Sequence, residues 1–284
     1  MKILLFTLTF LLIMFTTLAY AEDKKDKKPV YGWIKESIIT LNYSQSKFDN
    51  WSKGGENTLT WQAELRAKFE KNELKYNWLN KGYLIYGKTQ VGTDITKKAS
   101  DEIRVESVYT YKVGSHVNPY VSFTGLTQFS KGYKYADTTQ IEVSNFWDPS
   151  FLTESIGIGY NGGESFKTRL GAALKQTITR NFNSYSDDPN TENIEKIDNS
   201  FGAESVTDLQ IKFNDDIIFL SMLQLFSNFR AIDEVDVRWN NLFVAKIMKY
   251  VSVSLSFDIV YDKNISKKRQ IQQIFAIGLT YSVF

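Results

Sequence analysis

The feature that most constrains this chain is a two-residue alternation of apolar and polar side chains, sustained over unusually long segments. The clearest segment runs from Asn57 to Asn72, where Leu59, Trp61, Ala63, Leu65, Ala67 and Phe69 alternate with Thr60, Gln62, Glu64, Arg66, Lys68 and Glu70. Successive side chains of a β-strand point to opposite faces, so this pattern predicts a strand with one apolar and one polar face. A soluble strand needs only about five or six residues, whereas a tilted strand that crosses a membrane needs about 9 to 11. The length therefore favours a membrane-spanning barrel over a soluble β-sandwich, which is the alternative.

Eleven further segments have the same character. The alternation is clear from Glu102 to Val113 and from Val251 to Tyr261. It is weaker in nine others: Ser37 to Ser46, Tyr76 to Gln90, Tyr120 to Ser130, Leu152 to Tyr160, Phe166 to Thr177, Gly202 to Phe213, Ile217 to Phe229, Asp236 to Met248 and Gln270 to Phe284. Bacterial barrels of one chain have an even number of strands. The sequence therefore predicts an all-β fold, a transmembrane antiparallel up-and-down β-barrel of about 12 strands.

Aromatic residues lie near the ends of these segments. Aromatic side chains make up 15% of the chain and Pro occurs only 4 times, which favours strands with aromatic girdles. The predicted girdle residues are Trp33, Trp51, Trp78, Tyr111, Tyr133, Trp147, Tyr160 and Tyr261. The last strand, with Tyr281 on its apolar face and Phe284 at the end, resembles the C-terminal signal that barrels present to their assembly machinery. Phe284 departs from that signal because it lies on the face opposite to Tyr281.

The N-terminal residues have the pattern of a secretory signal peptide. Lys2 precedes an apolar run from Ile3 to Leu18, and Ala19-Tyr20-Ala21 forms a small-residue cleavage site. We therefore expect a signal peptide at 1–21, a charged flexible lead at 22–32 and the barrel at 33–284. These features together predict export to the outer membrane of a Gram-negative cell.

Composition excludes several kinds of site. Without cysteine and with one histidine, the chain has neither thiolate ligands nor a multi-histidine metal site. The 34 basic and 32 acidic residues are nearly balanced, so nothing indicates nucleic-acid binding. His116 follows Ser115 in a predicted turn, and no G-x-S-x-G motif is present. We expect no enzyme activity, no metal and no cofactor.

Two segments between strands stand out. The first contains Asn50, Trp51, Gly54, Gly55, Glu56 and Asn57, which is typical of a structural hairpin turn. A ligand or partner contact at the barrel rim is the functional alternative for this turn. The second is the polar stretch from Asn181 to Ser200, predicted to be the largest non-alternating insert and an outward-facing loop.

Charged residues of both signs lie on the polar faces. The candidates for a role in the lumen or at the rim are Arg66, Arg104, Arg169, Arg238, Glu64, Glu102 and Glu106. Such residues can pair across the lumen and nearly close it, or they can line a narrow water-filled pore. Mixed charge predicts weak ion selectivity in the second case.

Several sequence blocks resemble an uncharacterised family of outer-membrane barrels, a domain of unknown function. The blocks are Asn42-Tyr43-Ser44-Gln45, then 50–57 (NWSKGGEN), Thr127 to Tyr133, Ser144 to Pro149, Leu225 to Phe229, Asp236 to Trp239 and Tyr261-Asp262. The resemblance spans about Tyr43 to the C-terminus and implies the fold and the location, but no activity. One departure is Leu170-Gly171-Ala172, where members of that family tend to have a Ser-Pro pair.

Three functions remain open from the sequence. The leading hypothesis is a passive, porin-like channel for small polar solutes. The second is a plugged structural or complex-forming barrel, and the third is an outer-membrane lipid hydrolase. The expected partners are outer-membrane lipid and the barrel assembly machinery, whereas the sequence identifies no solute and no protein partner.

Overall fold

The computed structural model describes residues 30–49, 55–136, 139–163, 165–188, 190–263, 266 and 268–283. The predicted signal peptide at 1–21, most of the lead at 22–32, and Asn50, Trp51, Gly54 and Phe284 lie outside these residues. Within the described part, no helix is long and apolar enough to cross a membrane.

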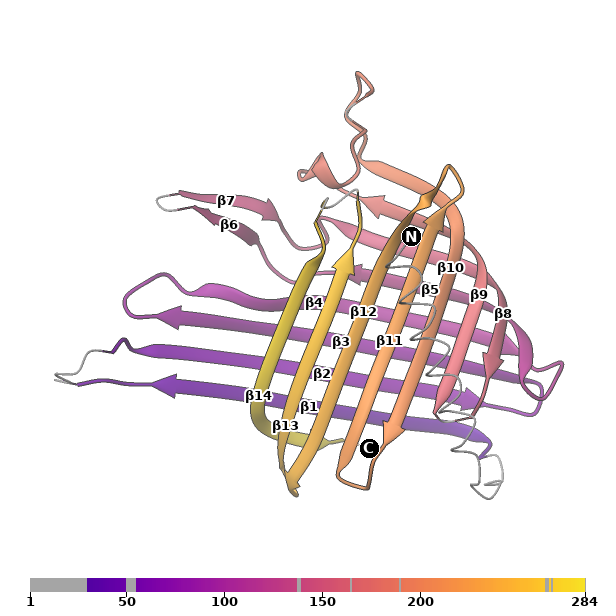
Figure 1. Ribbon diagram of the computed structural model, residues 1–284, viewed down its shortest axis with the longest axis horizontal. Coiled ribbons are helices and arrows are strands. Elements are labelled where there is room, and N and C mark those ends of the chain that lie inside the picture. Colours follow the sequence, from indigo (N-terminus) through magenta and orange to yellow (C-terminus); the bar gives the residue numbers. More distant parts are fainter. Residues whose placement is uncertain are drawn as a thin grey trace, which may run out of the picture. The chain divides into compact units, whose positions relative to one another are not determined.

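Twelve antiparallel strands of the described chain close into one barrel (Figure 1). They are β1 (Gly32–Ser46), β2 (Thr58–Asn72), β3 (Tyr76–Val91), β4 (Lys97–Tyr111), β5 (Val117–Thr127), β8 (Ser150–Asn161), β9 (Phe166–Ile178), β10 (Ile197–Lys212), β11 (Ile217–Asn228), β12 (Ala231–Met248), β13 (Val251–Tyr261) and β14 (Gln270–Ser282). Each strand pairs with the next barrel strand along the chain, and β14 returns to β1. The prediction of an all-β, up-and-down barrel of about 12 strands is confirmed.

Each of the twelve predicted segments corresponds to one barrel strand, but several boundaries differ. The wall strands β1, β10 and β12 begin about five residues before the predicted Ser37, Gly202 and Asp236. The hairpin of β6 (Gly132–Ala136) and β7 (Thr139–Ser144) was not predicted, and it forms a separate sheet outside the barrel wall. Its strands are too short to show a long alternation. This hairpin makes 128–149 a longer connection than the one at 179–196, but 179–196 is the longest connection without a strand, which agrees with the non-alternating insert predicted at Asn181 to Ser200.

Connections at the two ends of the barrel differ in length. The end that we call the turn end has the short connections 73–75, 112–116, 162–165, 213–216 and 249–250. The opposite end, the loop end, has 47–57, 92–96, 128–149, 179–196, 229–230 and 262–269. Barrels of the bacterial outer membrane have short turns on the periplasmic side and longer loops on the outer side.

The outer surface of the wall is apolar and exposed, whereas charged side chains are buried inside. Ile156, Leu170 and Phe275 are 63 to 65% exposed, but Glu204 is 1% and Glu106 is 8% exposed. Soluble proteins show the opposite distribution, because Glu is almost never fully buried unless it is paired. The soluble β-sandwich is therefore wrong, and the polar faces predicted for β2, β4 and β13 point into the barrel.

An aromatic girdle surrounds the turn end. Ring contacts along it are Trp33–Trp78 at 6.3 Å, Tyr76–Tyr109 at 5.5 Å, Tyr160–Phe166 at 6.2 Å, Phe213–Phe243 at 6.3 Å and Tyr250–Tyr281 at 6.5 Å between centroids. Aromatic rings favour the interface between hydrocarbon and water. Trp33, Trp78 and Tyr160 were predicted for this role, whereas Tyr261 of the same set borders a cavity of the lumen at the loop end.

The seam that closes the barrel is short. The described residues of β1 and β14 pair only from Ile38↔Ser282 to Asn42↔Gly278, whereas β1 pairs with β2 along its entire length. Beyond Asn42 the two strands diverge, as Figure 1 shows. The seam is therefore the part of the wall with the fewest backbone hydrogen bonds.

Candidate functional site

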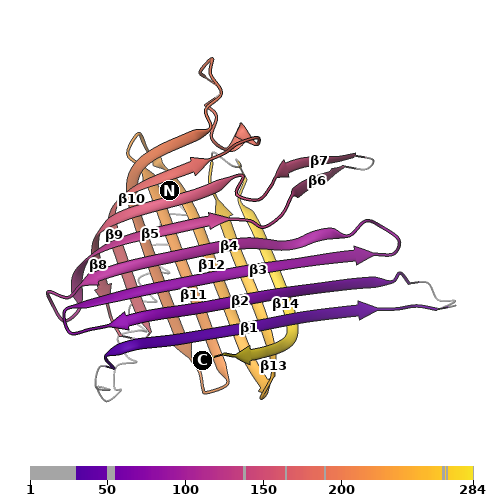
Figure 2. The ribbon, with the colours of Figure 1, turned by 180° about the vertical axis from the view of Figure 1, so that it is seen from behind.

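The centre of the lumen is crossed by contacts between β4 and β12. In the ring of strands these two lie six positions apart in either direction, so they face each other across the barrel (Figure 2). Arg104 Nη1 on β4 donates to Asn240 Oδ1 on β12 over 3.1 Å, and Arg238 Nη1 on β12 lies 3.3 Å from Glu102 Oε2 on β4. Glu102 also pairs with Arg104 at 2.5 Å. We call these four residues the central layer.

A second layer lies nearer the turn end. Glu106 on β4 is 2.6 Å from Arg169 Nη2 on β9 and 3.2 Å from Lys81 Nζ on β3. Lys81 also contacts Asp208 of β10 at 3.3 Å. These four residues, the turn-side layer, carry two positive and two negative charges, so they neutralise one another.

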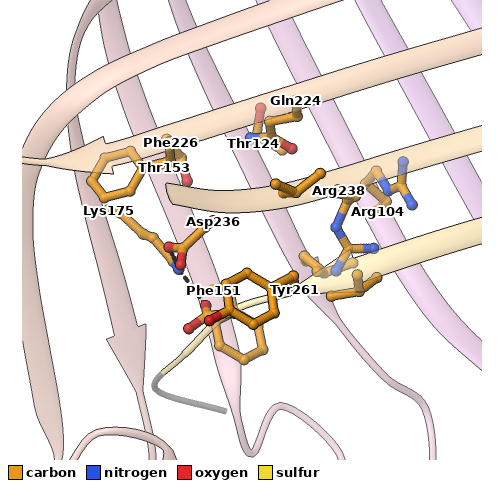
Figure 3. Close-up of a pocket in the computed structure, with 14 residues that line it drawn as sticks. Arg104, Thr124, Phe151, Thr153, Lys175, Gln224, Phe226, Asp236, Arg238 and Tyr261 are labelled. Carbon is orange, nitrogen blue, oxygen red and sulfur yellow. Dashed lines mark hydrogen bonds and ion pairs between the residues drawn. The ribbon is translucent and has the colours of Figure 1, made fainter. Parts of the chain in front are cut away.

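A third layer lies toward the loop end. Lys175 Nζ on β9 lies 2.7 Å from Asp236 Oδ2 on β12 and 2.5 Å from Asp262 Oδ2, which follows β13. This loop-side layer borders a cavity of about 90 Å³ whose lining includes Arg104 and Arg238 of the central layer (Figure 3). The lumen thus has ion pairs at three depths and a cavity between two of them.

The remaining predicted pair lies on β2. Arg66 is paired with Glu64, and its guanidinium carbon lies 4.4 Å above the ring of Tyr83. The guanidinium carbon of Arg104 lies 5.7 Å from the centroid of the same ring. Tyr83 therefore connects the Glu64–Arg66 pair to the central layer through cation–π contacts.

All seven charged residues predicted for the lumen or rim lie on inward-facing positions, and five of them belong to the central and turn-side layers. The prediction omitted Lys81, Lys175, Asp236 and Asp262. Glu204 on β10 is also buried in the lumen, and its Oε1 accepts from Gln224 Nε2 at 2.8 Å. A sequence signal was available for Lys175, because it has the same parity as Arg169 on the alternating strand β9. No such signal exists for Asp262, which lies beyond the end of β13.

The described part of the signature turn has a structural role. Gly55 has φ +145, and a Cβ there would lie 2.8 Å from the ring of Phe48. Asn57 accepts a hydrogen bond from Phe48 N at 2.7 Å, and its carbonyl accepts from Gly92 N at 2.6 Å. These contacts tie the connection at 47–57 to the neighbouring one at 92–96.

Asp148 connects the two longest loops. Its carboxylate, on a side chain that is 2% exposed, accepts from the backbone N–H groups of Arg180 at 3.0 Å and Asn181 at 2.8 Å. Burial raises the pKa of the nearby Tyr185 phenol, and the Asp148 carboxylate raises it further. The loop end therefore has fixed, hydrogen-bonded connections above the lumen.

His116 lies in the connection at 112–116, as predicted for a turn residue. Its Nδ1 is hydrogen-bonded to Ser115 Oγ at 2.9 Å, and its ring stacks on Tyr160 with centroids 5.9 Å apart. Both residues are at the turn end, outside the lumen layers. Among the described residues, no group of three or more His, Cys, Asp or Glu side chains has the arrangement of a metal site.

The comparisons with known proteins do not identify an activity for this chain. Residues 43–133 match the model of a family described as a protein of unknown function (DUF3078), so the match includes the first blocks of the resemblance and none after Tyr133. No curated protein matches the chain.

Several solved structures are similar to the chain at low identity. The translocator domain of autotransporter NalP from Neisseria meningitidis is 8% identical, with 97% of this chain and 96% of that chain covered and a TM-score of 0.41. The COG4313 outer membrane channel from Pseudomonas putida F1 is 10% identical, with 92% and 98% covered and a TM-score of 0.40. The NanC porin is 8% identical, with 88% and 98% covered and a TM-score of 0.38.

Proposed function

We propose that this chain is an outer-membrane β-barrel that conducts small polar solutes through a bore narrowed by its own ion pairs. The observation that carries the proposal is the central layer, in which Arg104–Asn240 and Arg238–Glu102 join strands on opposite sides of the lumen. A solute can pass only where these side chains move aside. The proposal assigns no reaction and no cofactor to the chain.

The outer wall supports the location. The closed sheet pairs the backbone groups of the wall strands along most of their length, which hydrocarbon cannot do, and its apolar surface ends in an aromatic girdle. The expected partners are therefore outer-membrane lipid and the assembly machinery that inserts such barrels. The short connections then face the periplasm and the long ones face outward.

The hydration of the layers supports a conduit over a solid plug. The side chains of Lys81, Asp208 and Glu102 are 35%, 33% and 24% exposed although they point into the lumen. Charges that remain in contact with water can separate at lower cost than charges in a dry interior. The ion pairs therefore act as a constriction that can open.

Conductance in planar bilayers tests the proposal. We expect small, weakly selective steps for the wild type, because the lumen has charges of both signs. The double variant Arg104→Gln and Arg238→Gln should conduct several-fold more, because it loses the contacts between β4 and β12. Lys131→Gln, next to the external hairpin, is the matched control and should conduct as the wild type does. Lys131 is exposed and, among the described residues, pairs only with Glu142.

A complex-forming barrel without transport is the second candidate, favoured by the three layers that cross the lumen. If the wild type and the double variant were both silent, although folded by heat-modifiability on a gel, the conduit would be wrong. Co-purification from native membranes would then identify the partner.

A further inference from the structure

The cavity at the loop side of the lumen has the properties of a ligand site. One part of its wall comes from β4, β5, β8 and β9, and another comes from β11, β12 and the end of β13. Its volume of about 90 Å³ is several times the space that one water molecule needs, which leaves room for a ligand of a few non-hydrogen atoms.

The charged side chains that line this cavity form two groups. Arg104 and Arg238 lie on one side, and Asp236 lies with Lys175 on the other (Figure 3). The Asp262 carboxylate also contacts Lys175. Glu102 contacts both arginines, and the Asp258 carboxylate, which accepts from Asn240 Nδ2 at 2.7 Å, also lies near them, so the two positive charges on that side face two carboxylates. On the opposite side two carboxylates contact a single ammonium group.

Each side also has hydrogen-bonding capacity that the described residues do not use. Arg238 contacts Glu102 through Nη1 alone, which leaves its Nε and Nη2 donors available. Asp236 contacts Lys175 through Oδ2 alone, so Oδ1 can accept from another group. The cavity therefore offers donors from a cation and acceptors from an anion at separate places.

Apolar rings complete the lining. Phe151 and Phe226 border the same cavity, and Lys175 Nζ lies 5.7 Å from the centroid of Phe226. Rings next to paired charges are suited to a ligand that has a short apolar part as well as charged ends.

We propose that this cavity binds a small zwitterion, such as an α-amino acid with a short side chain. The ligand carboxylate pairs with Arg238 and Arg104, its ammonium group pairs with Asp236, and its apolar part lies against the aromatic rings. An arginine fork suits a carboxylate because two N–H groups can donate in parallel. The inference rests on the proposed function in one respect: the ligand is one of the solutes that pass through the barrel.

Equilibrium binding to the purified barrel in detergent micelles tests this assignment without any measurement of conductance. The probes are L-alanine, acetate and methylammonium, measured by isothermal titration calorimetry at one ionic strength. We expect L-alanine to bind at least 10-fold more tightly than either single-charge probe. Equal affinity for acetate and L-alanine would make this an anion site and overturn the proposal, as would the absence of L-alanine binding.

Two charge variants should change the preference in opposite directions. Arg238→Gln should weaken L-alanine binding and raise the relative affinity for methylammonium, because the ligand carboxylate loses the arginine that it pairs with. Asp236→Asn should weaken it as well but raise the relative affinity for acetate. Lys131→Gln, next to the external hairpin, is the control and should bind as the wild type does. If both charge variants lost affinity for all three probes to the same extent, the assignment of the ligand's carboxylate end to Arg238 and of its ammonium end to Asp236 would be overturned.

A cavity-filling variant tests the location without a change in charge. Thr153 lines the cavity from β8, and Thr153→Leu would occupy its volume. We expect this variant to fold, as checked by heat-modifiability, and to lose L-alanine binding at least 10-fold. Unchanged binding would place the zwitterion elsewhere and overturn the proposal. Normal conductance without L-alanine binding would refute only this inference. Silence of both the wild type and the double arginine variant, while the wild type still binds L-alanine, would refute only the conduit.

Discussion

Arg104 and Asn240 are joined by a hydrogen bond of 3.1 Å although their strands, β4 and β12, lie on opposite sides of the barrel. The residues are 136 positions apart in the chain. The contact shows that side chains span the lumen of a twelve-stranded barrel, which strand count alone leaves undecided between a filled interior and a channel.

Glu106→Gln should destabilise the barrel more than neutralisation of an exposed acid. Glu106 is 8% exposed and pairs with both Lys81 and Arg169, so its loss leaves two cations facing each other. Removal of one partner from a buried ion pair costs roughly 3–5 kcal/mol, and we expect about 3 kcal/mol because the lumen is partly hydrated.

The measurement for Glu106→Gln is urea unfolding in micelles. Glu36→Gln is the matched control, because Glu36 pairs with Lys68 at 3.3 Å but its side chain is 59% exposed. An exposed pair contributes about 1 kcal/mol or less. Equal costs for the two variants would show that the turn-side layer does not stabilise the fold.

Leu65→Arg and Glu64→Gln test the assignment of the two faces of β2. Leu65 lies between Ile39 and Leu84 in the register of neighbouring strands, on the outer face. Arginine on the lipid face near the bilayer midplane costs about 2–4 kcal/mol. Glu64→Gln should cost little, because glutamine still provides an acceptor for Arg66. Equal destabilisation in a refolding titration would contradict these faces.

Engineered cysteine pairs test the short seam, and the chain has no cysteine of its own to interfere. Cysteines at Leu41 and Leu279, which pair across β1 and β14, should form a disulfide rapidly with copper phenanthroline. If the register continued past Asn42 and Gly278, the next pair would be Tyr43 and Ile277. Cysteines at these two positions should react slowly, because the strands have diverged there.

The control for the slow pair uses the same Ile277 site. Cysteines at Val253 and Ile277 pair across β13 and β14 and should react as fast as the first pair on a non-reducing gel. Fast reaction of the Tyr43 and Ile277 pair would mean that the seam closes further than the structure shows.

The sequence by itself determined the wall of this protein. Alternation is a local property of the extended chain, so Glu64 and Leu65 could be assigned to opposite faces before any strand pairing was known. The same parity predicted that Arg104, Arg169 and Arg238 point inward. It failed for β6 and β7, because strands of 5 and 6 residues without a membrane to cross need no long alternation.

Only the tertiary structure decided which inward charges meet. The partner of Arg104 depends on the closure of twelve strands and on the register of each pair, and neither is encoded in a local period. Lys175 shows the same limit, because Asp236 reaches it from β12 and Asp262 from the end of β13, and neither strand neighbours β9. Parity places a side chain inside the barrel, whereas the register and the closure determine the charge that it faces there.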